Sequence, residues 1–153
     1  MAIRSVTALA LSALVLSVAA SAEKKIDRSA LPPAVEKTVK AQSLGATIKG
    51  FSIDHENGHT EYEVEMVSNG HTKDIAIAKD GTLLEVEEEV KFASLPLETQ
   101  HSLTAAAAKA KITKIESLTK KNKLVAYEAA TLDGSKTGEI QVGPNGEKLL
   151  HEE

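Results

Sequence analysis

The feature that most constrains this chain is an internal repetition at an interval of 64 to 65 residues. The matching segments are Leu31-Pro32 and Leu95-Pro96, Tyr62-Glu63 and Tyr127-Glu128, Ile75-Ala76-Ile77 and Ile140-Gln141-Val142, and Asp80-Gly81 and Asn145-Gly146. Agreement in residue type, order and spacing is typical of a chain built from copies of one unit. We interpret residues 31–94 as a first repeat and residues 95–153 as a second, with residues 23–30 as a linker.

Each repeat begins with proline and then changes its hydrophobic period. Pro33 and Pro96 suit the first turn of a helix, where a missing N–H is tolerated. Farther on, residues 62–66 alternate apolar side chains with glutamates, which indicates a half-buried strand, and Asn-Gly or Asp-Gly pairs between such runs indicate hairpins. The predicted fold class is α+β: two tandem repeats, each with one helix packed on a four-stranded antiparallel meander sheet. Because one repeat alone would be marginally stable, we expect the two to pack together or to join their sheets edge to edge.

Alternation within the strands separates two faces of the predicted sheet. The helices should cover the face that carries Tyr62, Val64, Ile75, Ile77, Val86, Tyr127, Ile140 and Val142. The opposite face is left to Glu61, Glu63, Glu65, Ala76, Glu85, Glu87, Ala126, Glu128 and Gln141. This second face is either solvated or a docking surface. The candidate partner-binding residues are its polar members, namely Glu61, Glu63, Glu65, Glu85, Glu87, Glu128 and Gln141.

Residues 1–22 have the composition of a secretory signal peptide. Arg4 is the one charged side chain before Glu23, and the uncharged run between them ends at Ala20-Ser21-Ala22, a small-x-small pattern of the kind that signal peptidase cleaves. Cleavage would deliver the chain to the periplasm or the medium. The alternative is an uncleaved anchor, because the eighteen uncharged residues approach the length that spans a bilayer.

Charge and cysteine content exclude several classes of function. The chain has no cysteine, which excludes thiol catalysis and cysteine-based zinc ribbons. With 18 basic and 22 acidic side chains, it lacks the excess of basic residues that is typical of nucleic-acid-binding proteins. The charge is uneven, since residues 31–94 hold 6 lysines against 12 acids whereas residues 95–153 hold 8 of each. The acidic half could steer a basic protein partner, or it could serve solubility alone.

The first repeat also carries a resemblance to a known family. Tyr62-Glu63-Val64-Glu65, the Asn69-Gly70 turn, residues 75–77 and Asp80-Gly81 together resemble PepSY-like domains, which are small secreted or periplasmic modules with a proline-led helix ahead of the hairpins. The tandem arrangement is similar to the β-lactamase inhibitory proteins, whose two helix-plus-four-strand repeats present a sheet face to an enzyme. The resemblance implies inhibition or modulation of peptidases and related exported enzymes, without catalysis by this chain.

The segment His55-Glu56-Asn57-Gly58-His59 matches H-E-x-x-H, the sequence of zinc proteases. That chemistry needs a helix, so that both imidazoles project from one face. Asn57-Gly58 favours a hairpin instead, because a glycine in a helix interior costs about 1 kcal/mol relative to alanine. On a hairpin, His55 and His59 could still flank the turn and meet across it. A metal- or small-ligand-responsive envelope protein that uses these two histidines is therefore the alternative function.

From these observations we expect a periplasmic or secreted protein-binding module that is not an enzyme. It should modulate or inhibit an exported peptidase or a related envelope protein. We expect a monomer that needs no cofactor, binds no nucleic acid and does not contact a membrane once the leader is cleaved. Apart from His55 and His59, no metal ligands are predicted.

Overall fold

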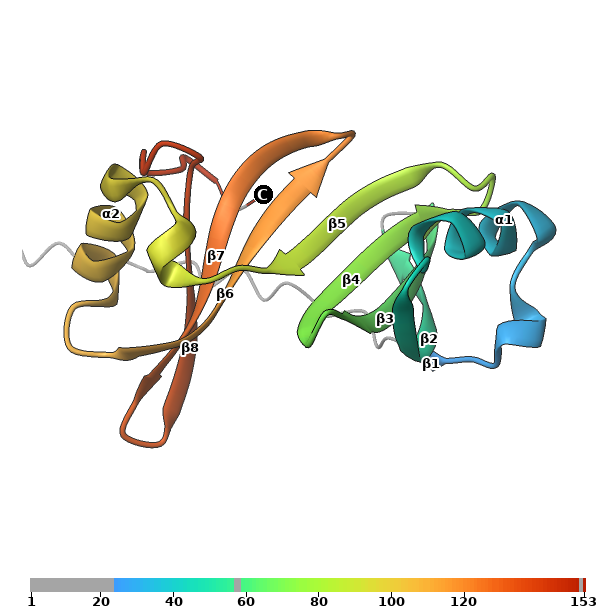
Figure 1. Cartoon of the computed structure of the whole chain (residues 1–153), viewed down its shortest axis with the longest axis horizontal. Helices are drawn as coiled ribbons and strands as arrows, with labels where there is room; N and C mark the ends of the chain where they lie inside the picture. Colours follow the sequence, from blue (N-terminus) through green and yellow to red (C-terminus); the bar gives the residue numbers. More distant parts are fainter. Residues whose placement is uncertain (1–23, 57–58, 152) are drawn as a thin grey trace, which may run out of the picture.

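The computed structural model describes residues 24–56, 59–151 and 153, and the leader predicted at residues 1–22 lies outside them. The elements in chain order are β1 (Lys24–Lys25), α1 (Pro33–Gln42), β2 (Ala46–Glu56), β3 (His59–Ser68), β4 (His71–Ala78), β5 (Leu83–Glu89), α2 (Leu97–Ala107), β6 (Lys111–Lys120), β7 (Lys123–Asp133) and β8 (Lys136–Val142). A short 3-10 helix precedes each α-helix, at Arg28–Ala30 and at Phe92–Ser94. Figure 1 shows the twisted sheet with the two helices toward its opposite ends.

All eight described strands form one antiparallel sheet in the order β1 to β8. The predicted α+β fold, with two repeats of a helix on its own four-stranded sheet, is therefore wrong, because the structure is a single, mostly β sheet with two helices. β5 pairs with β4 on one side and with β6 on the other, so the sheet has no boundary between its halves. The described residues after β8 form no further strand, so the second predicted repeat lacks its fourth strand. Strand periodicity indicates the face of a residue but not its neighbouring strand, which explains the error.

α1 covers the N-terminal half of the sheet. Pro33 occupies its first position, where no backbone N–H is needed. Val35 and Val39 lie one turn apart and are both fully buried. The cluster that they join also contains Leu31, Tyr62, Val64, Met66, Ile75 and Ile77. Gly81, in the turn after β4, closes the contact with the helix: its φ is +88°, and an added Cβ would lie 2.7 Å from the carbonyl oxygen of Ala34.

α2 covers the C-terminal half through a buried stripe of Thr99, Leu103 and Ala107. The cluster beneath it contains Leu95, Leu103, Ile115, Ala129 and Val142, with Tyr127 and Ile140 half-buried against it. Val86 packs against the cluster under α1 and Val90 against the cluster under α2. Because alternate residues of an extended segment share a face, both helices lie on the same face of the sheet. Among the described residues, no helix is long and apolar enough to cross a membrane.

Candidate partner-binding face

The face of the sheet opposite the two helices is called the open face. The residues predicted to bind a partner all lie on it, because each alternates along its strand with a residue of the helix-covered face: Glu61, Glu63, Glu65, Glu85, Glu87, Glu128 and Gln141. The open face also carries charged residues that were not predicted from the sequence to bind a partner, among them Asp74 on β4 and Lys114 and Glu116 on β6. The alternation of Asp74 with Ile75 could have revealed the first, whereas the other two become neighbours of this group only through the pairing of β5 with β6.

Carboxylates stand directly opposite one another on neighbouring strands of the open face. Glu65 is paired with Asp74, and Asp74 is paired in turn with Glu87. One strand farther on, Glu116 is paired with Glu128. Carboxylate oxygens of Asp74, Glu87 and Glu116 lie within 4.8 Å of one another. These five carboxylates, on Glu65, Asp74, Glu87, Glu116 and Glu128, are called the acidic row. Like charges directly opposite one another destabilise a sheet, so the acidic row lowers the stability of the fold. Such local conflicts are typical of functional sites.

Crowding changes the protonation of this row. Burial, followed by the charges of neighbouring carboxylates with Glu85 first among them, raises the pKa of Glu87 to about 8. Burial, followed by the charge of Glu116, also raises the pKa of Asp74. A protonated Glu87 can donate a hydrogen bond to the side chain of Glu85, with which it is hydrogen-bonded. The row therefore carries less negative charge near neutral pH than its composition indicates, and an approaching cation would favour its full ionisation.

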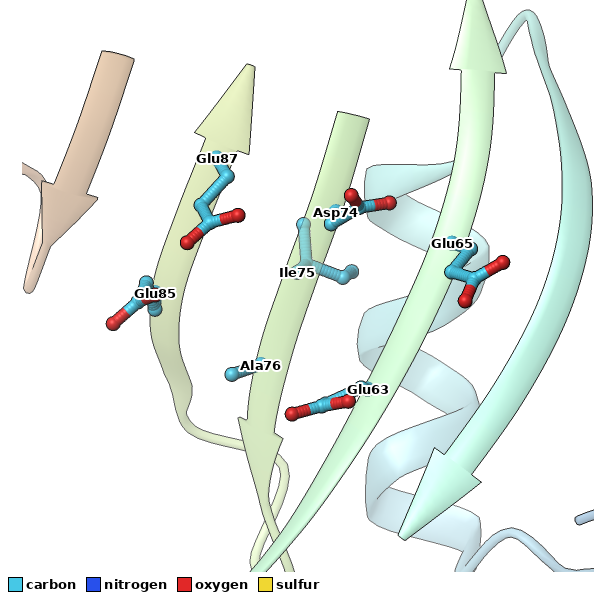
Figure 2. Close-up of a pocket in the computed structure, with 7 residues that line it drawn as sticks. All are labelled: Glu63, Glu65, Asp74, Ile75, Ala76, Glu85 and Glu87. Atoms are coloured by element: carbon cyan, nitrogen blue, oxygen red, sulfur yellow. The ribbon is translucent and has the colours of Figure 1, made fainter. Parts of the chain in front are cut away.

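A hollow of about 220 Å³ opens in the middle of the open face (Figure 2). It exists because the small side chain of Ala76 is paired with Glu63 on one side and with Glu85 on the other. Figure 2 shows the acidic side chains around this alanine on three neighbouring strands. The lining residues are Glu63, Glu65, Asp74, Ile75, Ala76, Glu85 and Glu87. Its acidic rim suits the ammonium or guanidinium end of a basic side chain, which pairs with carboxylates through charge-assisted hydrogen bonds.

Two lysines of β6 neutralise part of this surface. Lys114 Nζ lies 2.7 Å from Glu116 Oε1, and Lys120 Nζ lies 3.4 Å from Glu85 Oε2. Glu116 is only 8% exposed in its side chain, so its ion pair is largely shielded from water. Even with these two pairs, carboxylates outnumber basic groups among the described residues of the hollow and its rim. The open face is therefore arranged to receive positive charge.

The last residue of the chain lies at the β8 end of the open face. The backbone N–H of Glu153 donates to Gln141 Oε1 at 2.9 Å, and Gln141 Nε2 donates to Glu128 Oε2 at 2.7 Å. Two of the predicted partner-binding residues, Glu128 and Gln141, are therefore already engaged with each other, and Gln141 also with the chain end. The hollow over β3, β4 and β5 is the part of the open face shaped to receive a side chain.

The H-E-x-x-H sequence spans a hairpin, with β2 ending at Glu56 and β3 beginning at His59. His55 is paired with Thr60, and its Nδ1 lies 3.0 Å from Thr60 Oγ1. His59 is the next residue of β3, so it points to the opposite face from His55. The two histidines therefore do not meet across the turn, and the geometry gives no support to a metal site that they share. The described residues that could supply oxygen ligands to a metal ion together are Asp74, Glu87 and Glu116.

Solved structures from Bacteroides share this fold. A BLIP-like protein from Bacteroides fragilis is 20% identical, with a TM-score of 0.57 over 80% of this chain and 86% of that one. A protein from Bacteroides eggerthii assigned provisionally to the periplasm is 13% identical, with a TM-score of 0.62 over 76% of this chain and 84% of that one. A DUF2874 family protein from Bacteroides uniformis is 12% identical, with a TM-score of 0.60 over 76% and 84%.

No protein-family model matches the chain, and neither does any curated protein sequence. At identities this low, the likeness to the solved structures shows the fold alone. The predicted similarity in architecture to the β-lactamase inhibitory proteins is supported by the BLIP-like structure. The resemblance to PepSY-like domains stays a prediction.

Proposed function

We propose that this protein is an exported, non-enzymatic module that binds another exported protein through the open face of its sheet and modulates it. The observation that carries the proposal is the set of mutually opposed carboxylates around the hollow at Ala76. Stability alone would favour neutral or alternating charges at these positions, because like charges placed opposite one another destabilise a sheet. A partner that brings positive charge to this face would relieve that repulsion.

The proposed location and class of partner rest on further observations. Export is supported by the leader-like composition of residues 1–22 and by the periplasmic assignment of the Bacteroides eggerthii protein. The BLIP-like structure supports protein binding as the activity, and we take the partner to be an exported peptidase or a related envelope protein. The division into two repeats, 31–94 and 95–153, after a linker at 23–30 belongs to the same proposal, as does action by a monomer without a cofactor.

The chemistry of the hollow specifies what the partner should present. A lysine or arginine would place its charge among Glu63, Glu85 and Glu87, and arginine has the planar fork that matches carboxylates. The surrounding acidic residues would steer a basic surface toward this point and accelerate its association. Because much of this attraction acts through solvent, binding should weaken as the salt concentration rises.

A photo-crosslinking amino acid at Ala78 tests the open face. Ala78 lies two residues from Ala76 on the same face of β4, so it reports on a partner at the hollow without filling it. Irradiation of cells that export this variant should join it to a discrete exported protein. Adding the Glu85→Gln and Glu87→Gln substitutions should reduce the apparent affinity about tenfold, which corresponds to about 1.4 kcal/mol.

The matched control places the same crosslinker at Lys37, which is exposed on α1 and lies on the helix-covered side. Equal crosslinking from both positions, or capture that the charge substitutions do not weaken, would refute binding by the open face. If the captured protein is a peptidase, the native chain should change its rate of hydrolysis, and the charge-substituted chain should do so about tenfold less effectively.

A further inference from the structure

β8 is the outer strand of the sheet in the described part of the chain. It is seven residues long, and its first four residues, Lys136 to Glu139, are exposed. The strand at the opposite edge, β1, has only two residues. An outer strand presents backbone N–H and C=O groups that can pair with a further strand. β8 is thus the longer of the two outermost strands that the structure describes.

The chain leaves β8 through the same turn by which it leaves β4. After β4, the N–H of Ala78 donates to the carbonyl oxygen of Thr82 at 2.9 Å. After β8, at an interval of 65 residues, the N–H of Gly143 donates to the carbonyl oxygen of Glu147 at 2.8 Å. The second bond of each turn also recurs, and it comes from a glycine with positive φ in both cases. The two strand ends are therefore equivalent in local structure.

The two turns lead into different structures. After the first, the chain forms β5, which pairs with β4 so that Val86 lies opposite Ile75 and Glu87 opposite Asp74. After the second, the chain reaches the open face, where the N–H of Glu153 binds the side chain of Gln141. Among the described residues, no strand lies along β8 in the position that β5 occupies along β4.

The alternation of the backbone indicates which groups of β8 point toward this position. The N–H of Gly143 points away from β7, and every second residue of a strand shares its direction, so the backbone groups of Gln141 and Thr137 point the same way. On β4, the counterpart of Thr137 is Thr72, whose N–H donates to Glu89 Oε2 on β5 at 3.0 Å. The equivalent N–H on β8 is thus placed to meet an acidic side chain of an added strand.

We propose that the outer edge of β8 accepts an extended strand from a partner protein, in the register that β5 takes on β4. β5 defines the chemistry of this strand. An apolar side chain would lie opposite Ile140, as Val86 lies opposite Ile75, and would extend the cluster under α2. An acidic side chain would lie near Thr137 and Lys136. The main-chain pairing would provide affinity and the alternate side chains specificity, as in other complexes formed by strand addition.

The occupant is a partner strand because the described parts of this chain do not supply one. The outermost strands of a second copy are β1, whose two residues are too few to cover the seven of β8, and β8 itself, which does not combine an apolar side chain opposite Ile140 with an acidic one opposite Thr137 as β5 would. The chain's own C-terminal residue is held on the open face by Gln141. This edge is separate from the hollow of the open face, so strand addition at β8 does not depend on the proposed function.

A synthetic peptide with the sequence of residues 82–90, which includes β5, is the probe. It is added to the mature protein, and amide hydrogen exchange is followed residue by residue by NMR. With saturating peptide, exchange of the Thr137 and Gln141 amides should slow about tenfold or more, because new hydrogen bonds protect them. Exchange at Thr72 should stay unchanged, because β5 of the same molecule already covers β4. A peptide with proline in place of Glu87 should have no effect, because Glu87 lies opposite Asp74 and its backbone N–H points toward β4 in the native register.

A pair of variants at Thr137 tests the edge from the side of the protein. Thr137→Pro removes an N–H that points away from β7, a position where an outer strand tolerates proline, and it should weaken peptide binding about tenfold. Thr137→Ala keeps that N–H and should bind as the native chain does. Three results would overturn the proposal. These are no slowing with the native peptide, equal slowing with the proline peptide, and concentration-dependent self-association that protects the same amides without peptide, since the occupant would then be a second copy.

Discussion

Replacing Glu87 by glutamine should stabilise the protein at alkaline pH and leave its stability nearly unchanged at acidic pH. Glu87 lies between Asp74 on β4 and the carboxylates of β6 and β7, and burial together with these neighbours raises its pKa to about 8. Ionising this group in the folded protein is therefore unfavourable. Glutamine keeps the shape of the side chain and removes its charge, so the substitution isolates the electrostatic contribution.

The size and sign of the effect follow from the pKa. The folded-state value of about 8, against 4.5 for the free side chain, corresponds to an upper limit of about 5 kcal/mol, at about 1.4 kcal/mol for each pH unit. Solvent reaches part of Glu87 and screens its neighbours, so we expect about 2 kcal/mol. Because the folded protein binds the proton more tightly than the unfolded chain, this contribution is fully present below pH 4.5 and is lost as the pH rises through about 8.

Urea unfolding followed by circular dichroism measures the effect. The native protein and Glu87→Gln are compared at about pH 5 and about pH 9, on either side of most of the titration. A chelator is present because Asp74, Glu87 and Glu116 could together hold a divalent cation. Glu88→Gln is the matched control, since Glu88 is the next residue of β5 but is exposed on the opposite face.

The expected result is a gain in the free energy of unfolding that grows with pH for Glu87→Gln and stays near zero for Glu88→Gln. A native protein whose stability relative to Glu87→Gln is the same at both pH values would refute the reasoning. A loss of stability on substitution at the higher pH would refute it more strongly, because it would show that the ionised carboxylate is favourably placed.

Two other substitutions test parts of the structure that position the open face. Gly81→Ala should lower the free energy of unfolding by about 3 kcal/mol, since its Cβ would lie 2.7 Å from the Ala34 carbonyl oxygen, whereas Gly70→Ala, at a similar φ with nothing within 4 Å, should cost about 1 kcal/mol. Similar losses in calorimetry would show that the contact with α1 contributes little. Lys114→Met should cost about 3 kcal/mol in urea unfolding near neutral pH, because it leaves the buried Glu116 without its ion pair, and a loss below about 1 kcal/mol would contradict that pairing as a support of the sheet.

Sequence alone was sufficient to assign residues to the two faces of the sheet. The alternation of Tyr62 and Val64 with Glu63 and Glu65 is local and follows from the two-residue period of a strand, so it holds whatever lies beside that strand. The same local logic predicted a hairpin at the H-E-x-x-H segment, where Asn57-Gly58 conflicts with a helix. Local preferences and the final structure agree at these places.

The arrangement of strands could not be predicted in the same way. Whether β5 ends one sheet or continues into the next depends on pairing between residues far apart in sequence, such as Glu87 opposite Leu118. That pairing brings Glu116, with its ion pair to Lys114, next to the carboxylates of β5. The sequence therefore predicted only some of the opposed carboxylates. The hollow forms because Ala76 on β4 lies between Glu63 on β3 and Glu85 on β5. This arrangement depends on the register of three strands, which the pattern of one segment does not reveal.

The position of β5 has a consequence for how the protein unfolds. The strand pairs with β4 and β6, and Val86 packs under α1 while Val90, just beyond it, packs under α2. Unfolding of either half would therefore remove hydrogen bonds and apolar contacts from β5, which is also part of the other half. The two hydrophobic clusters should behave as one cooperative unit with a single transition, although each has its own helix. The sequence thus consists of two halves, but separating them at β5 would destabilise both.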